Sequence, residues 1–334
     1  MKSIINKLLV TILIGIIGFV AYSNKDQLPE IAERTKTKAV EVSESVSTAI
    51  NNNSPKATPN KVVQEESNYE TTDKRLKSGY KPIVLTESYE HDKWTTEPQE
   101  LVREFRAYIV SFDDNSDNIL TRNPDWVAYE MRAKPSNMPD GKAPNRPSTW
   151  IEDDKYNDEA PHDKSYLHSG FHRGHLCMKH IAWRLGANAD WNTHTTINAS
   201  PQHAKFNTGV WLDMENKTKD WADEYGRIWV ICGGAYKDKK PSLWIGDEGE
   251  ERVAVPEYFW KIVIRLDGEE IKSLAFMYPH KDIKKSLTTK KYFHARYLTS
   301  INDIEDSTGL DFLTTIEDEK EEVIEALIAT DIWK

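Results

Sequence analysis

The chain has 334 residues, of which 38% are hydrophobic, and it carries a formal net charge of −10. This length suffices for one sizeable core or at most two domains, and the 11 Trp and 14 Tyr residues exclude a wholly disordered protein. The acidic balance argues against a protein that binds nucleic acid through its overall charge, so any contact with phosphate needs a local basic patch.

The first 23 residues have the features of a targeting segment. Two lysines precede an apolar run at 8–22, and Ala21 and Ser23 offer a small-x-small cleavage pattern. The run has the length of a signal-peptide core and is short for a membrane span. We therefore expect a secreted or periplasmic product. The alternative is an uncleaved N-terminal anchor, and only then would the protein contact a membrane.

Composition divides the remainder of the chain. Residues 24–80 are rich in Lys, Glu, Ser, Thr and Asn and poor in large apolar residues, which predicts a disordered polar linker. We place the folded domain at 81–334.

Within this domain, strand patterns precede and follow a long irregular stretch. Five segments have strand character: 106–113, 126–133, 227–236, 258–267 and 271–279. The stretch 134–170 is rich in Pro, Asn, Asp and Gly and is predicted to be a long loop, which in a compact domain is usually functional. Helical signals are strongest at 203–223 and 317–330. These elements predict an α+β fold with a mainly antiparallel sheet.

Asn207, Trp211 and Glu215 recur at four-residue steps in the first of these helices. Such spacing puts them on one helix face, over about 12 Å of axis. A neighbouring apolar stripe can bury the helix: Val210, Met214 and Trp221. Buried Asn and Glu cost free energy unless something satisfies them, and a hydrated divalent cation such as Mg²⁺ would do so. The alternative is an ordinary amphipathic helix with a polar edge.

His175 follows Arg173 and Gly174. A histidine can take a proton from water, an adjacent arginine can neutralise charge on a phosphate, and a glycine lets the backbone approach a ligand. Taken alone, however, this tripeptide is explained as well by a core or surface histidine.

Other histidines and the cysteines allow alternatives. His172, His175 and His180 could form a zinc site, but their spacing is unusual for zinc and no cysteine pair accompanies them. Surface or polar-network positions are expected for three more histidines: His168, His194 and His203. Cys177 and Cys232 are expected to be buried core residues, and a disulfide between them stays open if the chain is exported.

Three motifs together resemble those of the DNA/RNA non-specific endonuclease family, the ββα-metal nucleases of the endonuclease G type. The motifs are SGFHRGH at 169–175, INASPQ at 197–202 and FNTGVWLDME at 206–215. The family pattern is an Asp-Arg-Gly-His run, a later Asn-x-x-Pro-Gln, and an Asn followed by Trp and Glu at four-residue steps. The likeness covers roughly residues 100–330. It implies an α+β, ββα-metal (His-Me finger) fold, in which helices flank a central, mainly antiparallel sheet.

The resemblance implies a general base and a metal site. His175 matches the base that activates water, Asn207 matches the single protein ligand of the metal, and Glu215 matches the carboxylate that holds the metal's waters. The implied cofactor is Mg²⁺, with Mn²⁺ as a substitute.

Further polar residues match the surroundings of the scissile phosphate. Arg173 matches the motif arginine near the phosphate, and Asn198 and Gln202 match polar residues that line the site. Arg146 is the candidate for a transition-state arginine from the preceding loop, with Arg132 as its competitor.

The implied function is non-specific hydrolysis of DNA and RNA phosphodiester bonds, which leaves 5′-phosphate and 3′-hydroxyl ends. The chain departs from the pattern at His172, where the family has Asp. This change is expected to weaken the geometry or shift the pH optimum without removing the base or the metal ligand. A catalytically weakened nucleic-acid-binding homologue on the same fold is therefore an alternative, as is an enzyme for another phosphodiester.

Lysines that could contact phosphate are Lys205, Lys217 and Lys219, whereas the basic stretch 284–296 is expected to be a solvated surface loop.

Overall fold

The computed structural model describes residues 88–334, except for 114–118, 137–145, 157 and 248–250. The targeting segment 1–23, the linker 24–80 and the beginning of the domain expected at 81–334 lie outside the described residues. In the part that is described, no helix is both long and apolar enough to cross a membrane.

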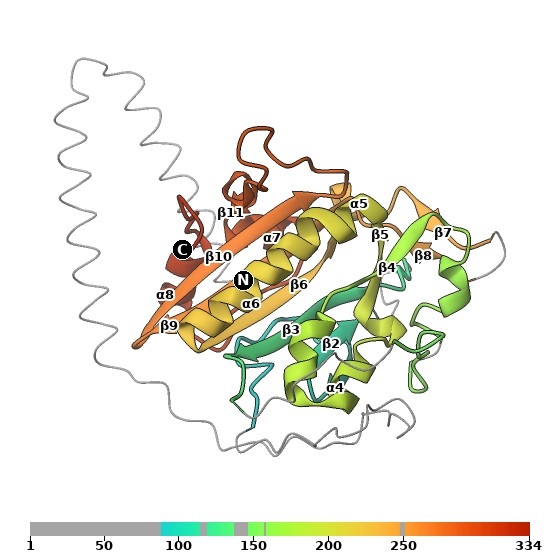
Figure 1. Ribbon diagram of the computed structural model, residues 1–334, viewed down its shortest axis with the longest axis horizontal. Coiled ribbons are helices and arrows are strands. Elements are labelled where there is room, and N and C mark those ends of the chain that lie inside the picture. The colour runs from blue at the N-terminus through green and yellow to red at the C-terminus, as the bar shows by residue number, and fades with distance from the viewer. Residues whose placement is uncertain (1–87, 114–118, 137–145, 157, 248–250) are drawn as a thin grey trace. The chain divides into compact units, whose positions relative to one another are not determined.

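Seven antiparallel strands form the central sheet (Figure 1). Their spatial order is β1 (Leu101–Phe105), β2 (Tyr108–Phe112), β3 (Pro124–Arg132), β6 (Arg227–Ala235), β9 (Tyr258–Asp267), β10 (Glu270–Pro279) and β11 (Leu298–Thr299). The five predicted strands correspond to β2, β3, β6, β9 and β10. Gly268, with a φ of 63°, makes the tight turn between β9 and β10. The predicted α+β class with an antiparallel sheet is confirmed.

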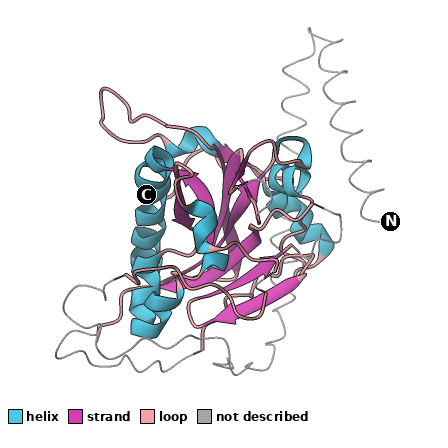
Figure 2. Cartoon of the chain, turned by 90° about the vertical axis from the view of Figure 1, so that its right-hand side faces the viewer, coloured by secondary structure: helices cyan, strands magenta, loops and turns pink. Residues whose placement is uncertain are grey.

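The sheet separates two apolar cores, because successive strand residues point to opposite faces. In β3, Tyr129 belongs to one core and Trp126 to the other. The first face is covered by α6 (Leu212–Tyr225), and the second by α7 (Ile301–Thr308) and α8 (Asp318–Glu325). Figure 2 shows helices on either side of the strands.

The two helices of the second face differ from the prediction. α7 has no counterpart among the predicted helices, although Ser300 and Asp303 form a capping box at its first turn. α8 ends at Glu325, before the predicted end at residue 330. The chain leaves the helix there, and Trp333 packs against Trp221 of α6, with ring centroids 5.2 Å apart.

A smaller two-stranded sheet leads into the helix of the first face. It pairs β4 (Phe171–His175) with β5 (Ala199–His203), which continues into α5 (Ala204–Phe206), the π-helical turn η7 (Asn207–Trp211) and α6. The helix predicted at 203–223 is therefore present, but with a kink at Gly209, whose φ of −107° and ψ of −110° are not helical. Such π-helical turns are frequent at functional sites.

The segments that connect these elements are mostly irregular and contain only short helices and strands. The described part of the predicted loop 134–170 contains one helical turn, η4 (Asp163–Tyr166). The other short elements are α3 (Lys179–Ala182), η5 (Trp183–Leu185), α4 (Ala187–Asn192), η6 (Thr196–Asn198), η8 (Lys237–Lys239), β7 (Trp244–Ile245), β8 (Val253–Ala254) and η9 (His294–Tyr297). Cys177 and Cys232 are buried free thiols, which confirms their assignment to the core.

Candidate active site

The β4–β5 hairpin and the following helix form one hydrogen-bonded unit. His175 ends β4, where it pairs with Ala199 of β5. The indole Nε1 of Trp211 donates a hydrogen bond of 3.2 Å to the backbone carbonyl of His175. This bond fixes the helix that carries Asn207 and Glu215 against the end of the strand.

The imidazole of His175 lies against two other rings. Its centroid is 4.7 Å from that of Trp150 and 4.9 Å from that of His194. Burial lowers the pKa of His175 well below its usual value, and the nearby His194, Arg146 and Lys179 lower it further. The ring is therefore neutral near pH 7, which is the form that accepts a proton. Its Nε2 is buried, with no hydrogen-bond partner in the described part of the chain, so this atom can serve a water or a substrate.

The middle of the predicted long loop is fixed beside this histidine. The Ile151 N–H donates to the His194 carbonyl at 2.9 Å, and the Thr196 N–H donates to the Ile151 carbonyl at 2.8 Å. This pairing holds Trp150 over the His175 ring. Of the surface and polar-network positions predicted for His194, burial excludes the surface one. The ring lies beside the base candidate, and its Nδ1 is 3.5 Å from the Thr193 hydroxyl.

The three candidate arginines have different surroundings. Arg146 is exposed, and its charge acts on the pKa of the base candidate. Arg132 instead forms an ion pair with Glu130. Arg173 forms an ion pair with Asp163 and also donates to its backbone carbonyl. Arg146 thus combines exposure with an electrostatic effect on the base candidate, although its role in a reaction stays a prediction.

Asn207 stands at the beginning of η7, where it is half-buried. Its Nδ2 lies 3.4 Å from Nδ1 of His172, the residue that replaces the family's Asp. Since the amide nitrogen is the donor in this contact, the carboxamide oxygen remains as an acceptor for another group.

Glu215 lies two helical turns beyond Asn207 and is only 8% exposed. Burial raises its pKa to about 7, although the Lys261 ammonium and the Trp211 indole both lower it. Lys261 of β9 is fully buried, with Nζ 4.3 Å from the Trp211 ring centroid and 3.5 Å from the Tyr129 hydroxyl. This buried cation was not predicted from the sequence, in which it is a single lysine within the otherwise apolar first part of β9.

Asn198 is fully buried and makes three hydrogen bonds to the backbone. Its Oδ1 accepts from the Cys177 N–H at 2.7 Å, and its Nδ2 donates to the carbonyls of Cys177 and Thr193, both at 2.9 Å. These bonds position the segment that follows His175. Any contact of Asn198 with a substrate stays a prediction.

Gln202 is also fully buried, and it packs over Gly174. A Cβ atom at position 174 would lie 2.2 Å from the Gln202 side-chain amide, so only glycine leaves room for it. Both amide atoms of Gln202 lack a hydrogen-bond partner among the residues that are described. Since buried amides normally have partners, Gln202 is suited to binding a water or ligand atom.

The donors on the helix fit a hard divalent cation. Asn207 offers a carboxamide oxygen and Glu215 a carboxylate, and oxygen ligands of this kind suit Mg²⁺. A buried carboxyl with a pKa of about 7 is also one that a nearby cation would stabilise in its charged form.

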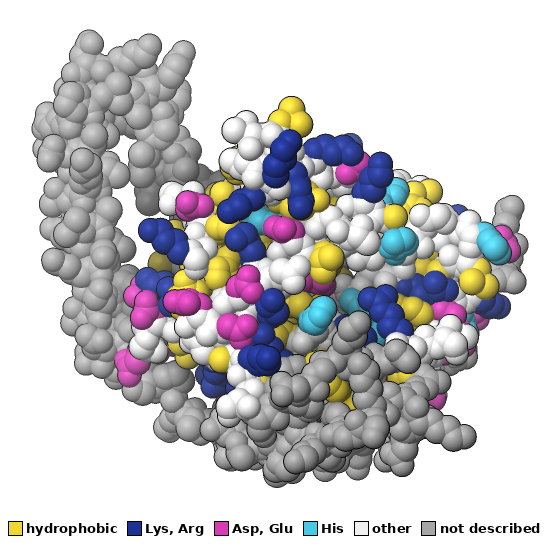
Figure 3. Space-filling view, in the orientation of Figure 1, with side chains coloured by type: hydrophobic (Ala, Val, Ile, Leu, Met, Phe, Trp, Pro, Cys, Tyr) yellow, Lys and Arg dark blue, Asp and Glu magenta, His cyan; other side chains and the backbone are white. Residues whose placement is uncertain are grey.

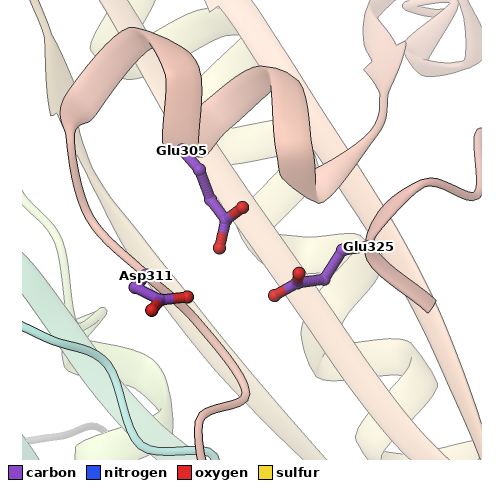
Figure 4. A group of neighbouring side chains, drawn as sticks. All are labelled: Glu305, Asp311 and Glu325. Carbon is purple, nitrogen blue, oxygen red and sulfur yellow. The ribbon is translucent and has the colours of Figure 1, made fainter. Parts of the chain in front are cut away.

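His172, His175 and His180 do not form a group of three ligands around one point in the described part of the chain. Within the described ranges, the one group of three His, Cys, Asp or Glu residues with ligand atoms within 4.8 Å of one another is acidic. It consists of Glu305, Asp311 and Glu325, whose carboxylates face one another (Figure 4). This trio belongs to the second face of the sheet, and Glu305 accepts a hydrogen bond of 2.9 Å from the Phe312 N–H after α7.

A two-stranded antiparallel sheet followed by a helix, with a histidine on the first strand and an asparagine on the helix, defines the ββα-metal nuclease fold. The sequence profile described as DNA/RNA non-specific endonuclease matches residues 92–319. The chain therefore belongs to the DNA/RNA non-specific endonuclease family.

Individual relatives agree with this family. "Nuclease 1, mitochondrial" of Schizosaccharomyces pombe is 26% identical over 224 residues, which cover 63% of this chain and 65% of that protein. The chain thus spans a little less than two thirds of this relative. "Nuclease" of Nostoc sp. is 22% identical over 208 residues, which cover 57% of this chain and 67% of that protein. A crystal structure of the EndoG/EndoGI complex has a TM-score of 0.51 at 21% identity, over 65% of this chain and 86% of that one, which shows a shared fold.

Proposed function

We propose that this protein is a metal-dependent, non-specific endonuclease that hydrolyses phosphodiester bonds of DNA and RNA. The ββα unit carries the proposal, because the Trp211 indole ties the strand with His175 to the helix with Asn207 and Glu215. Membership of the endonuclease family and the names of two relatives support the same chemistry.

His175 would be the general base. Its Nε2 would take a proton from the attacking water, whose oxygen forms a bond to phosphorus while the bond to the 3′ oxygen breaks. The 3′ oxygen then takes up a proton, so the products carry 5′-phosphate and 3′-hydroxyl ends. The lowered pKa keeps His175 in the neutral form that this step requires.

Asn207 would hold Mg²⁺, or Mn²⁺ as a substitute, through its carboxamide oxygen, and Glu215 would accept hydrogen bonds from the waters of the ion. When bound, such an ion neutralises charge on the scissile phosphate and on the leaving oxygen. Arg146 would add positive charge near the phosphate, and Arg173 would orient the strand end through its pair with Asp163.

The substrate backbone would lie along residues 281–296, which we call the basic loop. It contains six basic residues and one acidic residue, a net charge of +5 in a chain of −10. Figure 3 shows Lys and Arg side chains gathered over this segment, which runs from just after β10 into η9. Contacts with phosphates carry no base identity, which agrees with a non-specific enzyme.

Three contacts hold the basic loop beside the proposed metal helix. His294 Nε2 is 2.9 Å from a carboxylate oxygen of Asp213 in α6. The Tyr292 hydroxyl packs closely on Gly209, since a Cβ atom at position 209 would lie only 2.8 Å from the hydroxyl oxygen. Asp282 is 3.6 Å from the ammonium of Lys205 in α5. The basic loop is therefore fixed next to the turn that begins with Asn207.

Digestion of plasmid DNA and of RNA by the full chain tests the function. We expect cleavage with Mg²⁺, none with EDTA, and a large loss in His175→Ala, while His168→Asn serves as a control at an exposed histidine. The 5′ ends of the products should accept a labelled phosphate from polynucleotide kinase only after phosphatase treatment. Cleavage by His175→Ala at the wild-type rate would contradict the proposal.

A weakened, nucleic-acid-binding homologue is the second candidate, and His172 is the observation that favours it. If the site has decayed, the wild-type chain binds nucleic acid with little cleavage, and His172→Asp restores a large part of the rate. Efficient cleavage by the wild type excludes this candidate.

We also propose that the protein is exported, either as a secreted or periplasmic product or on an N-terminal anchor. The charged and apolar pattern of residues 1–23 supports this location. Cell fractionation combined with N-terminal sequencing distinguishes the cleaved from the anchored form, and recovery of the intact chain in the cytosol would contradict both.

A further inference from the structure

His172 contacts the side chain that would bind the metal. Its Nδ1 is 3.4 Å from Nδ2 of Asn207, although the two residues are 35 positions apart in the chain. The amide nitrogen can only donate, so the imidazole nitrogen accepts. The lone pair of His172 Nδ1 is therefore directed at the head group of Asn207.

The His172 Nδ1 lone pair accepts a hydrogen bond in the metal-free protein. The same lone pair could instead coordinate a cation bound at this position. Half a turn of the Asn207 amide exchanges its oxygen and nitrogen at nearly the same positions. Oδ1 of Asn207 and Nδ1 of His172 would then be neighbours, at a separation near the present 3.4 Å. Adjacent ligands of a six-coordinate ion with bonds of about 2.1 Å lie about 3 Å apart, so one ion can accept both atoms.

The surroundings allow such binding without a large cost. The His172 side chain is exposed, and Asn207 is half-buried. Waters can therefore complete the coordination sphere, and little desolvation accompanies the approach of an ion.

Replacement of Asp by His changes the chemistry offered to the ion. A carboxylate suits hard ions such as Mg²⁺ through its charge, whereas a neutral imidazole suits later first-row ions. The affinity of a nitrogen-containing site rises from Mn²⁺ through Co²⁺ to Ni²⁺. The exchange thus removes a negative charge that favours Mg²⁺ and adds a nitrogen that favours transition metals.

We propose that His172 is a second protein ligand of the metal at Asn207, and that it shifts the preference of the site from Mg²⁺ toward Mn²⁺, Co²⁺ and Ni²⁺. The inference rests on the proposed function, because it takes the metal site at Asn207 from there. In this protein the metal would be held by one oxygen and one nitrogen of the chain.

Metal binding to the full chain, without a histidine tag and dialysed against EDTA, tests the inference independently of activity. Titration calorimetry with Mg²⁺ and with Co²⁺ gives an affinity ratio for the wild type and for His172→Asp. We expect the preference for Co²⁺ over Mg²⁺ to fall about tenfold or more in His172→Asp. Pulsed electron paramagnetic resonance of bound Mn²⁺ should show directly coordinated nitrogen in the wild type and none in the variant.

Two further variants separate the possible outcomes. His168→Asn changes another exposed histidine and should bind metals as the wild type does. Asn207→Ala should lose binding of every ion, and wild-type binding by this variant would overturn the metal site of the proposed function itself. If Asn207→Ala loses binding while His172→Asp keeps the affinity ratio and the nitrogen signal, the role of His172 is wrong and the nuclease proposal stands.

Discussion

Glu215 is held in an environment that opposes its charge. Its pKa in the folded protein is about 7, against an ordinary value of 4.5. The native protein therefore keeps a proton that the unfolded chain has already released at intermediate pH. The unfolded state gains relative stability as pH rises through this interval, so the buried carboxyl destabilises the metal-free protein at alkaline pH.

Glu215→Gln should consequently stabilise the metal-free protein while it impairs cleavage. At about pH 8.5 the free energy of unfolding should rise by up to about 3 kcal/mol, and at about pH 4 the gain should disappear. Urea unfolding in EDTA at both pH values measures the difference. Glu224→Gln, at an exposed position of the same helix, is the control and should change little. Equal or lower stability of Glu215→Gln at the higher pH would refute this account of the site.

Candidate site residues could be predicted from the sequence where they belong to a motif. Residues that only the fold brings to the site could not be predicted. His175, Asn207 and Glu215 stand in short motifs with characteristic spacing. By contrast, none of the motifs contains His194, whose carbonyl pairs with the N–H of Ile151, a residue far away in the chain. Lys261 lies under the helix because β9 occupies its particular place in the sheet, and no local pattern contains that information.

The pairing of β4 with β5 depends on the absence of a side chain at Gly174. The Gln202 amide occupies the space that a Cβ atom would need, at 2.2 Å. Gly174→Ala should therefore push Gln202 aside and destabilise the hairpin by about 1–3 kcal/mol.

A double-mutant cycle checks this contact. Gln202→Ala alone should cost stability through lost packing, and in the double variant Gly174→Ala should cost much less than in the wild type. Chemical unfolding of the four proteins gives the coupling free energy. Additive effects would show that the two positions do not interact.

Strands with apolar runs could be predicted from the sequence, whereas the two strands that carry the candidate site could not. β6 and β9 are largely apolar segments and were found from the sequence. β4 reads FHRGH and β5 reads ASPQH, so neither has the alternation that identifies a strand, and their pairing stabilises them instead. α7 was missed although its capping residues were visible, because the helix is short and Ile301 and Ile304 are its two apolar residues.

The protein as a whole carries a net charge of −10, which would repel a polyanionic substrate. The basic loop resolves this conflict locally, because its charge of +5 is concentrated beside the proposed metal helix. Electrostatic attraction would then act at the site while the rest of the surface repels nucleic acid, which makes binding sensitive to salt.

Charge reversal in the basic loop should weaken binding and its salt dependence. In Lys285→Glu/Lys291→Glu we expect weaker binding of a single-stranded oligonucleotide, and a salt slope reduced by about 1–2. Fluorescence anisotropy in EDTA at several salt concentrations measures both quantities. Lys237→Glu/Lys240→Glu makes the same charge change at exposed residues at or next to η8, and should have a much smaller effect. Equal losses in the two variants would show that overall charge, and not the basic loop, attracts the substrate.

The general-base role of His175 is measured by the single-turnover rate at which His175→Ala cleaves a labelled oligonucleotide, without and with added imidazole. If His175 is the base of a phosphodiesterase site, the substitution should lower the rate by about 10²–10⁴-fold. Free imidazole should restore part of the rate in the variant and leave the wild type unchanged. A variant that cleaves as fast as the wild type would contradict the role of His175, and a wild type that cleaves neither DNA nor RNA with any divalent ion would contradict the nuclease function.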